Sequence, residues 1–421
     1  MADVQPLRAL HYNLERTGGL QDVIAPPYDV IDADERAALE DRSPYNVVRI
    51  DLPEGEDPYE TAAGLLDQWR ADGVVVADEK PAIWVLSQDY TGPDGRTRTR
   101  TGFLARVRVD EYGAGRIRPH ERTHPGPKED RLRLTRATEA NLSPIFSLFA
   151  DPAGRARGAL EAATAADPWS TTRDGDGTVN RLWRIDDEEI VRQLTGALAD
   201  VELLIADGHH RYETARVYAE EIGGEGPHRY VLMCLAALED PGLTVFPTHR
   251  LLRNLTAEQQ EALAIALRHG FEIEELDDVA QLAPGQQKRG DIVLGYIDSH
   301  LRRPFRLTLR DPAIADAALP DRAEPYRRLD TAVLEALILK DALHMTDEDI
   351  DHLTQLGYAR DAAEAIAQVQ SGEVDAAFLM APVPVELVQE VAAAGETMPP
   401  KSTYFFPKVP TGLLFNPLSD G

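Results

Sequence analysis

The sequence predicts a mixed α/β (α+β) protein in which helices accompany antiparallel hairpins. Its 421 residues are 43% hydrophobic and 28% charged, as in ordinary globular proteins, and they suffice for two or three domains. Apolar residues at helical spacing alternate along the chain with short apolar runs that turn formers separate. The two patterns together predict helices and strands in one fold.

The predicted elements follow in chain order. The segments with helical spacing are 34–39, 57–71, 211–222, 331–343, 359–370 and 385–394. The segments typical of strands are 46–52, 82–86, 99–107, 201–206 and 376–380, with a hairpin over 291–310. The turn formers Thr91-Gly-Pro-Asp-Gly-Arg96 predict that 82–86 and 99–107 also form a hairpin. Gly372 and Gly395 are expected to close two helices as left-handed caps.

The composition excludes several classes of protein. Lys and Arg number 44 against 72 Asp and Glu, so the net charge is −28, which argues against a nucleic-acid partner. The single Cys234 can build neither a disulfide framework nor a thiolate metal site. No run of 18 apolar residues and no signal-like N-terminus occurs, so we expect a cytoplasmic protein with no membrane partner. The oligomeric state stays open, a homo-oligomer included.

The segment Asp207-Gly-His-His-Arg211 carries the strongest chemical signal. It lies where a predicted buried strand turns into a helix, and the N–H groups and dipole at such a junction favour an anion. Gly208 lets the backbone approach a ligand, while His209, His210 and Arg211 add side-chain donors. Asp207 is suited to hold a metal ion or to orient an imidazole. The plainer alternative is an Asp helix cap beside structural histidines.

A second signal, His120-Glu-Arg-Thr-His124, matches the zinc-protease pattern H-E-x-x-H. That pattern needs both histidines on one helical face, and the flanking Pro119 and Pro125-Gly-Pro127 oppose a long helix. A zinc hydrolase through His120, Glu121 and His124 is therefore only a third interpretation.

We favour a basic loop around Glu121. Residues 116–136 contain seven basic and three acidic side chains, against the acidic trend of the chain. Among Thr123, Lys128 and Arg131, the Glu121 carboxylate can accept the proton of a substrate hydroxyl or hold Mg²⁺. The basic side chains can then steady phosphoryl oxygens. A solvated basic loop without function remains the alternative.

Two further segments are weaker candidates. Phe246-Pro-Thr-His-Arg250 places a His-Arg pair after an apolar strand, and Lys401-Ser-Thr-Tyr404 places a cation and hydroxyls on a loop. Arg49 and Arg250 are available to receive a substrate carboxylate. Neither G-x-x-x-x-G-K-[ST] nor G-x-G-x-x-G occurs, so the sequence predicts neither a P-loop nor a Rossmann site.

Short segments along nearly the whole chain resemble the family known as domain of unknown function 1015. The segments are Ala25-Pro-Pro-Tyr-Asp-Val-Ile31, Asn46-Val-Val-Arg49, His120-Glu121, Gly126-Pro-Lys-Glu-Asp-Arg131, Ser143-Pro-Ile145, Asp207-Gly-His-His-Arg211, Pro247-Thr-His-Arg250, Met398-Pro399, Lys401-Ser-Thr-Tyr-Phe405-Phe-Pro-Lys408 and Gly412-Leu413. His124 is not part of that pattern.

The Asp207–Arg211 segment also resembles the core of the ParB/sulfiredoxin-like fold, whose relatives include kinases that phosphorylate free L-serine. The resemblance implies a ParB-like core with additional helices and hairpins, and a phosphotransferase that uses ATP, ADP or pyrophosphate with Mg²⁺. A nucleotide- or metabolite-sensing regulator without turnover is the second hypothesis.

The residue types described above and the resemblance, which itself implies the roles of Glu121 and Asp207–Arg211, together predict the following roles. The catalytic residues are Glu121, Asp207, His209 and His210, with Asp207 also the metal ligand. The phosphate- and donor-binding residues are Thr123, Lys128, Arg131, Gly208, Arg211, Lys401, Ser402 and Thr403. The substrate-binding residues are Arg49, His249 and Arg250. We expect an N-terminal α/β region over 1–115, a ParB-like phosphate-binding core over 116–330, and a C-terminal α/β region over 331–421 that completes the site.

Overall fold

The computed structural model describes residues 2–113, 116–121, 125–286, 288 and 290–419. Of these, residues within 1–119, 123–243 and 407–421 form one compact unit, here the first unit. Residues within 120–122 and 244–406 form the second unit. These divisions do not coincide with the expected borders near 115 and 330, so the three-region organisation stays a prediction.

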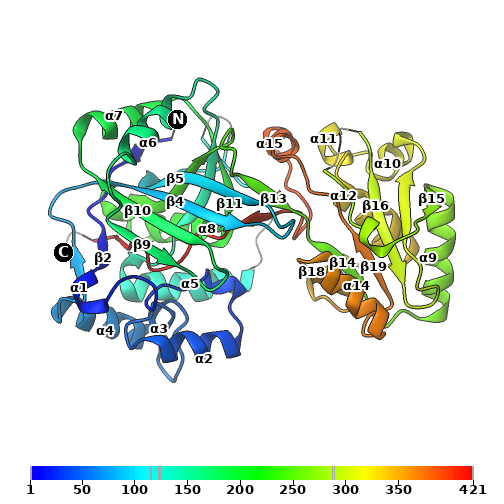
Figure 1. The fold of residues 1–421 in the computed structure, drawn as a ribbon, viewed down its shortest axis with the longest axis horizontal. Coiled ribbons are helices and arrows are strands. Elements are labelled where there is room, and N and C mark those ends of the chain that lie inside the picture. The colour runs from blue at the N-terminus through cyan, green and yellow to red at the C-terminus, as the bar shows by residue number, and fades with distance from the viewer. Residues whose placement is uncertain (1, 114–115, 122–124, 287, 289, 420–421) are drawn as a thin grey trace. The chain divides into compact units, whose positions relative to one another are not determined.

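A mixed sheet of nine described strands forms the centre of the first unit (Figure 1), in the order β6-β11-β8-β12-β5-β4-β10-β9, with β1 on β5. The strands are β1 (Val4–Gln5), β4 (Ile83–Thr91), β5 (Thr97–Arg108), β6 (Ile117–Arg118), β8 (Ile145–Phe149), β9 (Ser170–Arg173), β10 (Val179–Ile185), β11 (Leu203–Asp207) and β12 (Tyr230–Ala237). β11 runs parallel to β6 and antiparallel to β8, and β12 runs parallel to β8. Two small ladders join β2 (Leu10–Tyr12) to β3 (Val75–Ala77) and β7 (Ala140–Asn141) to β21 (Asn416–Pro417).

Helices cover the sheet of the first unit. They are α1 (Leu14–Thr17), η1 (Tyr28–Val30), α2 (Ala33–Arg42), α3 (Val48–Asp51), α4 (Pro58–Ala71), α5 (Pro125–Thr138), α6 (Arg155–Ala163), α7 (Glu188–Ala197), α8 (His209–Ile222) and η2 (Pro227–Arg229). Buried side chains of α6, α7 and α8, among them Leu160, Leu194 and Tyr212, pack with those of the central strands in one apolar core. This core fixes the end of β11 and the start of α8.

The second unit contains an antiparallel sheet of six described strands, in the order β15-β17-β16-β19-β14-β18. Its strands are β14 (His249–Leu252), β15 (Phe271–Glu275), β16 (Val293–Asp298), β17 (Phe305–Leu309), β18 (Leu356–Ala359) and β19 (Ala376–Leu379), and β13 (Thr244–Phe246) pairs separately with β20 (Tyr404–Phe406). Its helices are α9 (Ala257–Gly270), η3 (Val279–Gln281), α10 (Pro312–Ala318), α11 (Glu324–Arg327), α12 (Asp330–Leu334), the π-helical η4 (Glu335–Ala342), α13 (Asp347–Asp351), α14 (Ala362–Ser371) and α15 (Val385–Ala393). Leu263 and Leu267 of α9 and Ile338 of η4 share its main core with the sheet.

The predicted mixed α/β class is confirmed, as are most of the elements. The hairpins over 82–107 and 291–310 appear as β4–β5 and β16–β17, and the predicted strand before Asp207 appears as β11. The helix predicted over 359–370 begins later, because β18 occupies the chain to Ala359 and Asp361 caps α14.

Two local predictions were wrong. Residues 46–52 were predicted as a strand, but Val48–Asp51 form helix α3, in which the apolar side chains Val48 and Ile50 are buried. The Asn46 side chain, one residue before the N-cap Val47, accepts the Val48 N–H at 3.0 Å. The basic loop predicted around Glu121 was expected to include Lys128 and Arg131, but both lie on helix α5, which begins at Pro125.

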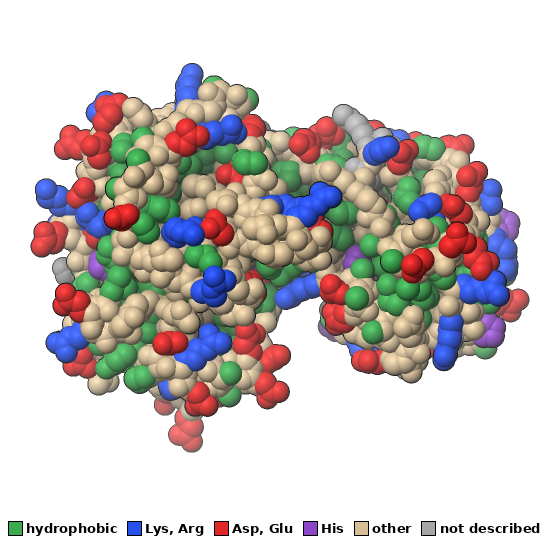
Figure 2. Space-filling view, viewed as in Figure 1, with side chains coloured by type: hydrophobic (Ala, Val, Ile, Leu, Met, Phe, Trp, Pro, Cys, Tyr) green, Lys and Arg blue, Asp and Glu red, His purple; other side chains and the backbone are tan. Residues whose placement is uncertain are grey.

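The surface agrees with the acidic composition. Figure 2 shows Asp and Glu side chains spread over the visible face among Lys and Arg side chains, not gathered in one patch. Within the described ranges, no helix combines the length and the apolar character that crossing a bilayer requires.

Candidate phosphate-binding site

In the first unit, the candidate site is the turn from β11 to α8. β11 is buried and ends at Asp207, and Gly208 follows with φ of +95°, a left-handed conformation that favours glycine. The first backbone bond of α8 runs from the Tyr212 N–H to the Gly208 carbonyl at 3.0 Å. The first-turn N–H groups and the positive end of the helix dipole therefore lie directly after Asp207.

Two cations hold the Asp207 carboxylate. Lys408 Nζ donates to Asp207 Oδ1 at 2.6 Å, and Arg211 Nη2 donates to Oδ2 at 2.8 Å. Burial by itself raises the pKa of Asp207, but the Lys408 ammonium and the Arg211 guanidinium outweigh burial and hold that pKa well below its usual range. Asp207 is therefore an ionised anchor for two cations, and it is a poor proton acceptor near neutral pH.

Arg211 is fixed from its other side as well. Its Nη1 donates to Ser143 Oγ at 2.8 Å and to the Pro144 carbonyl, and Thr411 Oγ1 donates to Ser143 Oγ at 3.0 Å. The two terminal nitrogens of Arg211 face Asp207, Ser143 and Pro144 in this arrangement. The expected bidentate contact of Arg211 with a phosphate therefore stays a prediction. Arg211 thus positions the turn.

Buried polar side chains of the central sheet set the position of Lys408. Arg100 of β5, 2% exposed, donates to the Pro407 carbonyl at 2.7 Å and stacks on Phe146. Gln88 of β4 donates to the Lys408 carbonyl at 3.2 Å. The backbone that carries Lys408 is therefore held by two strands, and its ammonium is directed at Asp207.

Three other predicted residues of the first unit have structural contacts. Lys128 Nζ lies 3.4 Å from Glu213 Oε2. Arg131 is buried and donates to the Asp51 carbonyl at 2.7 Å and to Asp130 at 2.8 Å. Arg49 Nη2 donates to the Glu40 carbonyl at 2.7 Å, near the end of α2. These contacts give Arg131 and Arg49 roles in holding helices, and their expected contacts with phosphate and substrate stay predictions.

In the second unit, the chain brings together predicted residues from two distant segments. Glu121 forms a β-bridge with Met398, and its Oε1 accepts the Lys401 N–H at 3.3 Å. His120 Nε2 lies 2.8 Å from Thr403 Oγ1. Ser402 is buried, and its hydroxyl donates to the Pro399 carbonyl at 2.7 Å. Glu121 therefore lies in a β-bridge and His120 in a bend, and neither is helical as a zinc H-E-x-x-H motif requires, while Thr123 and His124 lie outside the described residues.

Arg250 organises the same loop. Its guanidinium is buried and donates to the Thr248, Pro400 and Lys401 carbonyls, the last two at 3.0 and 3.1 Å. Lys401 adopts φ of +57°, a conformation rare for a residue with a side chain. Because Arg250 uses its donors on these carbonyls, it supports a strained loop, and its predicted contact with a substrate carboxylate stays a prediction.

The neighbouring His249 is held neutral. Its Nδ1 accepts the Met380 N–H at 3.1 Å, and burial, followed by the nearby Arg250 cation, lowers the pKa of His249 to about 4. An unfolded histidine titrates near 6.5, so the folded protein resists a protonation that the unfolded chain accepts. The stability from this difference is present above about pH 6.5 and is lost as the pH falls toward 4.

We expect His249 to account for a loss of about 2 kcal/mol in unfolding free energy between pH 7 and pH 5. Urea denaturation at both pH values measures it, and His249→Asn, which keeps an acceptor near Nδ1, should show a drop smaller by that amount. His352→Asn, a change at an exposed histidine of the same unit, should leave the drop unaltered. An equal drop in wild type and His249→Asn would contradict the assignment.

The described residues do not fit a protein-bound Mg²⁺ centre. Both carboxylate oxygens of Asp207, the expected ligand, already face cations. Among the residues that the structure describes, no cluster of three or more His, Cys, Asp or Glu side chains could hold a metal ion. Mg²⁺ as a companion of the donor phosphates, where it commonly keeps several waters, remains a proposal.

Sequence reasoning missed Lys408, Ser143 and Thr411 as members of the site. Lys408 lies 201 positions from Asp207, and helical or strand spacing carries no information over that separation. The available signal was that Ser143 and Lys408 both belong to the segments that carried the family resemblance.

Comparison with solved structures gives weak likenesses. A conserved hypothetical protein from Pyrococcus furiosus is 16% identical, with 70% of this chain and 89% of that chain covered and a TM-score of 0.34. A free serine kinase in complex with AMP is 15% identical, with 69% and 83% covered and a TM-score of 0.35. A C-terminally truncated SbnI from Staphylococcus aureus is 13% identical, with 72% and 82% covered and a TM-score of 0.36. No curated protein matches the chain.

The family comparison is more specific. The family described as "Protein of unknown function (DUF1015)" matches residues 4–332, more than three quarters of the chain. The match includes the Asp207 turn, α3 and the β14 segment, and it confirms the resemblance that the sequence motifs indicated. The chain belongs to the DUF1015 family.

Proposed function

We propose that this protein is a small-molecule phosphotransferase that transfers a phosphoryl group from ATP, ADP or pyrophosphate to a metabolite hydroxyl. The observation that carries the proposal is the cluster of Lys408, Asp207 and Arg211 at the start of α8. It gathers an ammonium, a guanidinium and a helix N-terminus at the end of a buried strand. Such a combination suits phosphate oxygens.

The chemistry needs little covalent help from the protein. Phosphoryl transfer depends on cations and N–H groups around the phosphate oxygens and on a carboxylate that accepts the proton of the attacking hydroxyl. Asp207 is unsuited to that second task, because Lys408 and Arg211 keep it ionised with a depressed pKa. We therefore propose that Asp207 positions the two cations. We propose Glu121 as the proton acceptor, because it is a carboxylate and because His120-Glu121 is one of the segments that resemble the family.

L-Serine is the acceptor that the resemblance of the Asp207–Arg211 segment to free serine kinases suggests. Incubation of the protein with L-serine, Mg²⁺ and each donor should yield O-phosphoserine, measured by mass spectrometry. Lys408→Met should reduce the yield by about 100-fold or more, since a cation on the transferring group commonly contributes that much. Lys340→Met, at an exposed ion pair with Asp347, is the matched control and should keep full yield. Absence of product with all three donors would reject the serine version.

A regulator that senses a phosphate ligand without turnover predicts a different pattern. With a kinase, Glu121→Gln should abolish turnover and leave nucleotide affinity within about twofold, whereas Glu373→Gln, at an exposed residue of the second unit, should change neither. Nucleotide binding without turnover in the wild type would favour the sensor. Turnover that survives Glu121→Gln would remove Glu121 as the proton acceptor.

A further inference from the structure

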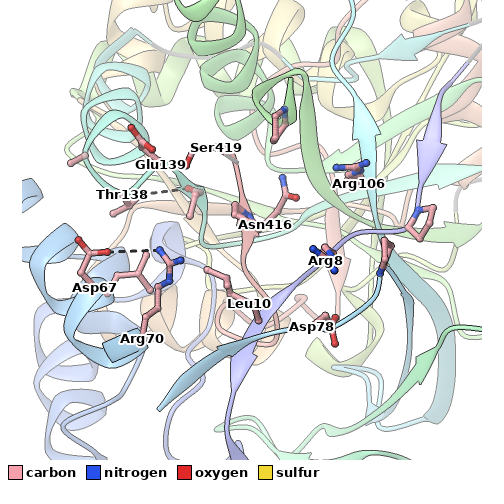
Figure 3. A pocket seen from close by; sticks show the side chains of 18 residues that line it. Arg8, Leu10, Asp67, Arg70, Asp78, Arg106, Thr138, Glu139, Asn416 and Ser419 are labelled. Atoms are coloured by element: carbon pink, nitrogen blue, oxygen red, sulfur yellow. Dashed lines mark hydrogen bonds and ion pairs between the residues drawn. The ribbon is translucent and has the colours of Figure 1, made fainter. Parts of the chain in front are cut away.

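The first unit also contains a cavity that does not involve the Asp207 turn. Its volume is about 780 Å³, within the range of sites for metabolites and cofactors. The wall is built by the chain before β2, by α4, by β5, by the end of α5 and by the C-terminal segment around β21 (Figure 3). None of Asp207, Arg211 and Lys408 lines it.

Three arginines line this cavity, and two of them form no ion pair within the described part of the chain. Arg70 lies 3.9 Å from Asp67, which offsets it. Arg8 donates to the Glu79 carbonyl, and Arg106 Nη2 donates to Gln5 Oε1 at 3.0 Å. Neither of these two arginines forms an ion pair with any carboxylate that the structure describes.

The acids of the wall do not neutralise them. The Asp78 carboxylate is buried and accepts from Arg184 at 2.7 Å, and it also lies near His11. Glu139 also lines the cavity. Burial raises the pKa of Tyr218, which does not line the cavity, and the nearby Glu139 carboxylate raises that pKa further. In a chain of net charge −28, the cavity thus presents two guanidinium groups that form no ion pair with the carboxylates of the described residues.

Arg106 is held ready for a ligand. Gln5 stands opposite Arg106 in the pairing of β1 with β5, and the Arg106 guanidinium stacks over the Tyr230 ring at 4.8 Å. Both contacts fix the plane of the guanidinium, which reduces the entropy lost when an anion binds. Figure 3 places Arg8 and Arg106 on the same side of the cavity, with Asn416 close to its middle.

We propose that this cavity is a second ligand site, which binds a small metabolite with two or more carboxylate or phosphate groups through Arg8 and Arg106. Planar guanidinium groups pair with both kinds of anion by two parallel hydrogen bonds. The volume exceeds what a single inorganic ion fills, which favours a ligand with several anionic groups. The site goes beyond the proposed phosphotransferase and does not depend on it.

Isothermal titration of the whole protein with citrate and, separately, with pyrophosphate tests the proposal. At least one probe should bind, and Arg8→Gln and Arg106→Gln should each weaken that binding by about tenfold or more. Citrate represents a carboxylate ligand and pyrophosphate a phosphate ligand, so the tighter probe identifies the anion class. Arg192→Gln, at an exposed ion pair of α7 outside the cavity, is the matched control and should bind like the wild type.

Two precautions keep the outcome interpretable. Pyrophosphate is also a candidate donor at the Asp207 turn, so the titration is repeated in Lys408→Met, where binding at the second site should persist. Arg8 is exposed, so Arg8→Gln remains informative even if Arg106→Gln fails to fold. Binding of neither probe, or equal binding by the wild type and Arg8→Gln, would overturn the second site and leave the proposed function untouched.

Discussion

Replacement of Asp207 by Asn is expected to lower the free energy of unfolding by about 3 kcal/mol at pH 7. The change leaves the Lys408 ammonium and the Arg211 guanidinium, whose side chains are only 18% and 10% exposed, facing each other without an anion. Removal of one partner from a buried ion pair typically costs about 3–5 kcal/mol, and the partial exposure here favours the lower end. Urea denaturation measures the loss.

Asp94→Asn is the matched control for this change. Asp94 and Arg98 form another ion pair four residues apart in the first unit, but the Asp94 side chain is 37% exposed, so its loss should cost less than about 1 kcal/mol. A similar loss in both variants would show that Asp207 is no special anchor.

The Asp207 effect should also depend on pH. Because the pKa of Asp207 is depressed in the folded protein, its contribution is present above the pKa of an unfolded aspartate, near 4. As the pH falls below 4 and through the folded pKa, the contribution is lost. The difference in stability between wild type and Asp207→Asn should therefore be constant from pH 8 to about pH 5 and shrink below pH 4.

Sequence reasoning succeeded where the signal was local. The apolar run before Asp207 and the following Gly-His-His-Arg predict a strand that turns into a helix, and β11 and α8 form that turn. Local reasoning was wrong at 46–52. The β-branched Val47, Val48 and Ile50 favour a strand. They form a helical turn because tertiary packing buries all three side chains, and the Asn46 side chain, which precedes the N-cap Val47, accepts the Val48 N–H.

The site itself depends on contacts that spacing does not reveal. Arg131 belongs to a basic run and was expected to bind phosphate, but the fold uses its guanidinium on Asp51 and Asp130. Besides Arg211, the cation that reaches Asp207 is Lys408, which lies in the C-terminal segment and is held there by contacts with Arg100 and Gln88. A charge run in sequence shows which residues are cationic, but tertiary packing decides which acceptor each one meets.

The second large effect is expected from Gly208→Ala, at about 3 kcal/mol of unfolding free energy. Gly208 has φ of +95°, where a Cβ costs roughly 1–2 kcal/mol. That Cβ would also lie 2.9 Å from Arg211 Nε and 3.0 Å from Arg211 Cζ, much closer than ordinary contact. Arg211 would have to move, and its hydrogen bonds to Ser143 and Asp207 would weaken, at about 1.5–3 kcal/mol for a bond to a charged group.

Gly154→Ala separates the two costs. Gly154 also precedes a helix, α6, in the left-handed conformation with φ of +65°, but a Cβ there meets no atom within 4 Å. It should therefore show the backbone cost alone, about 1 kcal/mol. Since only Gly208→Ala displaces Arg211, only this variant should also lose nucleotide affinity, measured by titration calorimetry. Equal losses of stability in the two variants, with nucleotide affinity unchanged, would mean that the close approach of Arg211 to Gly208 contributes nothing to the turn.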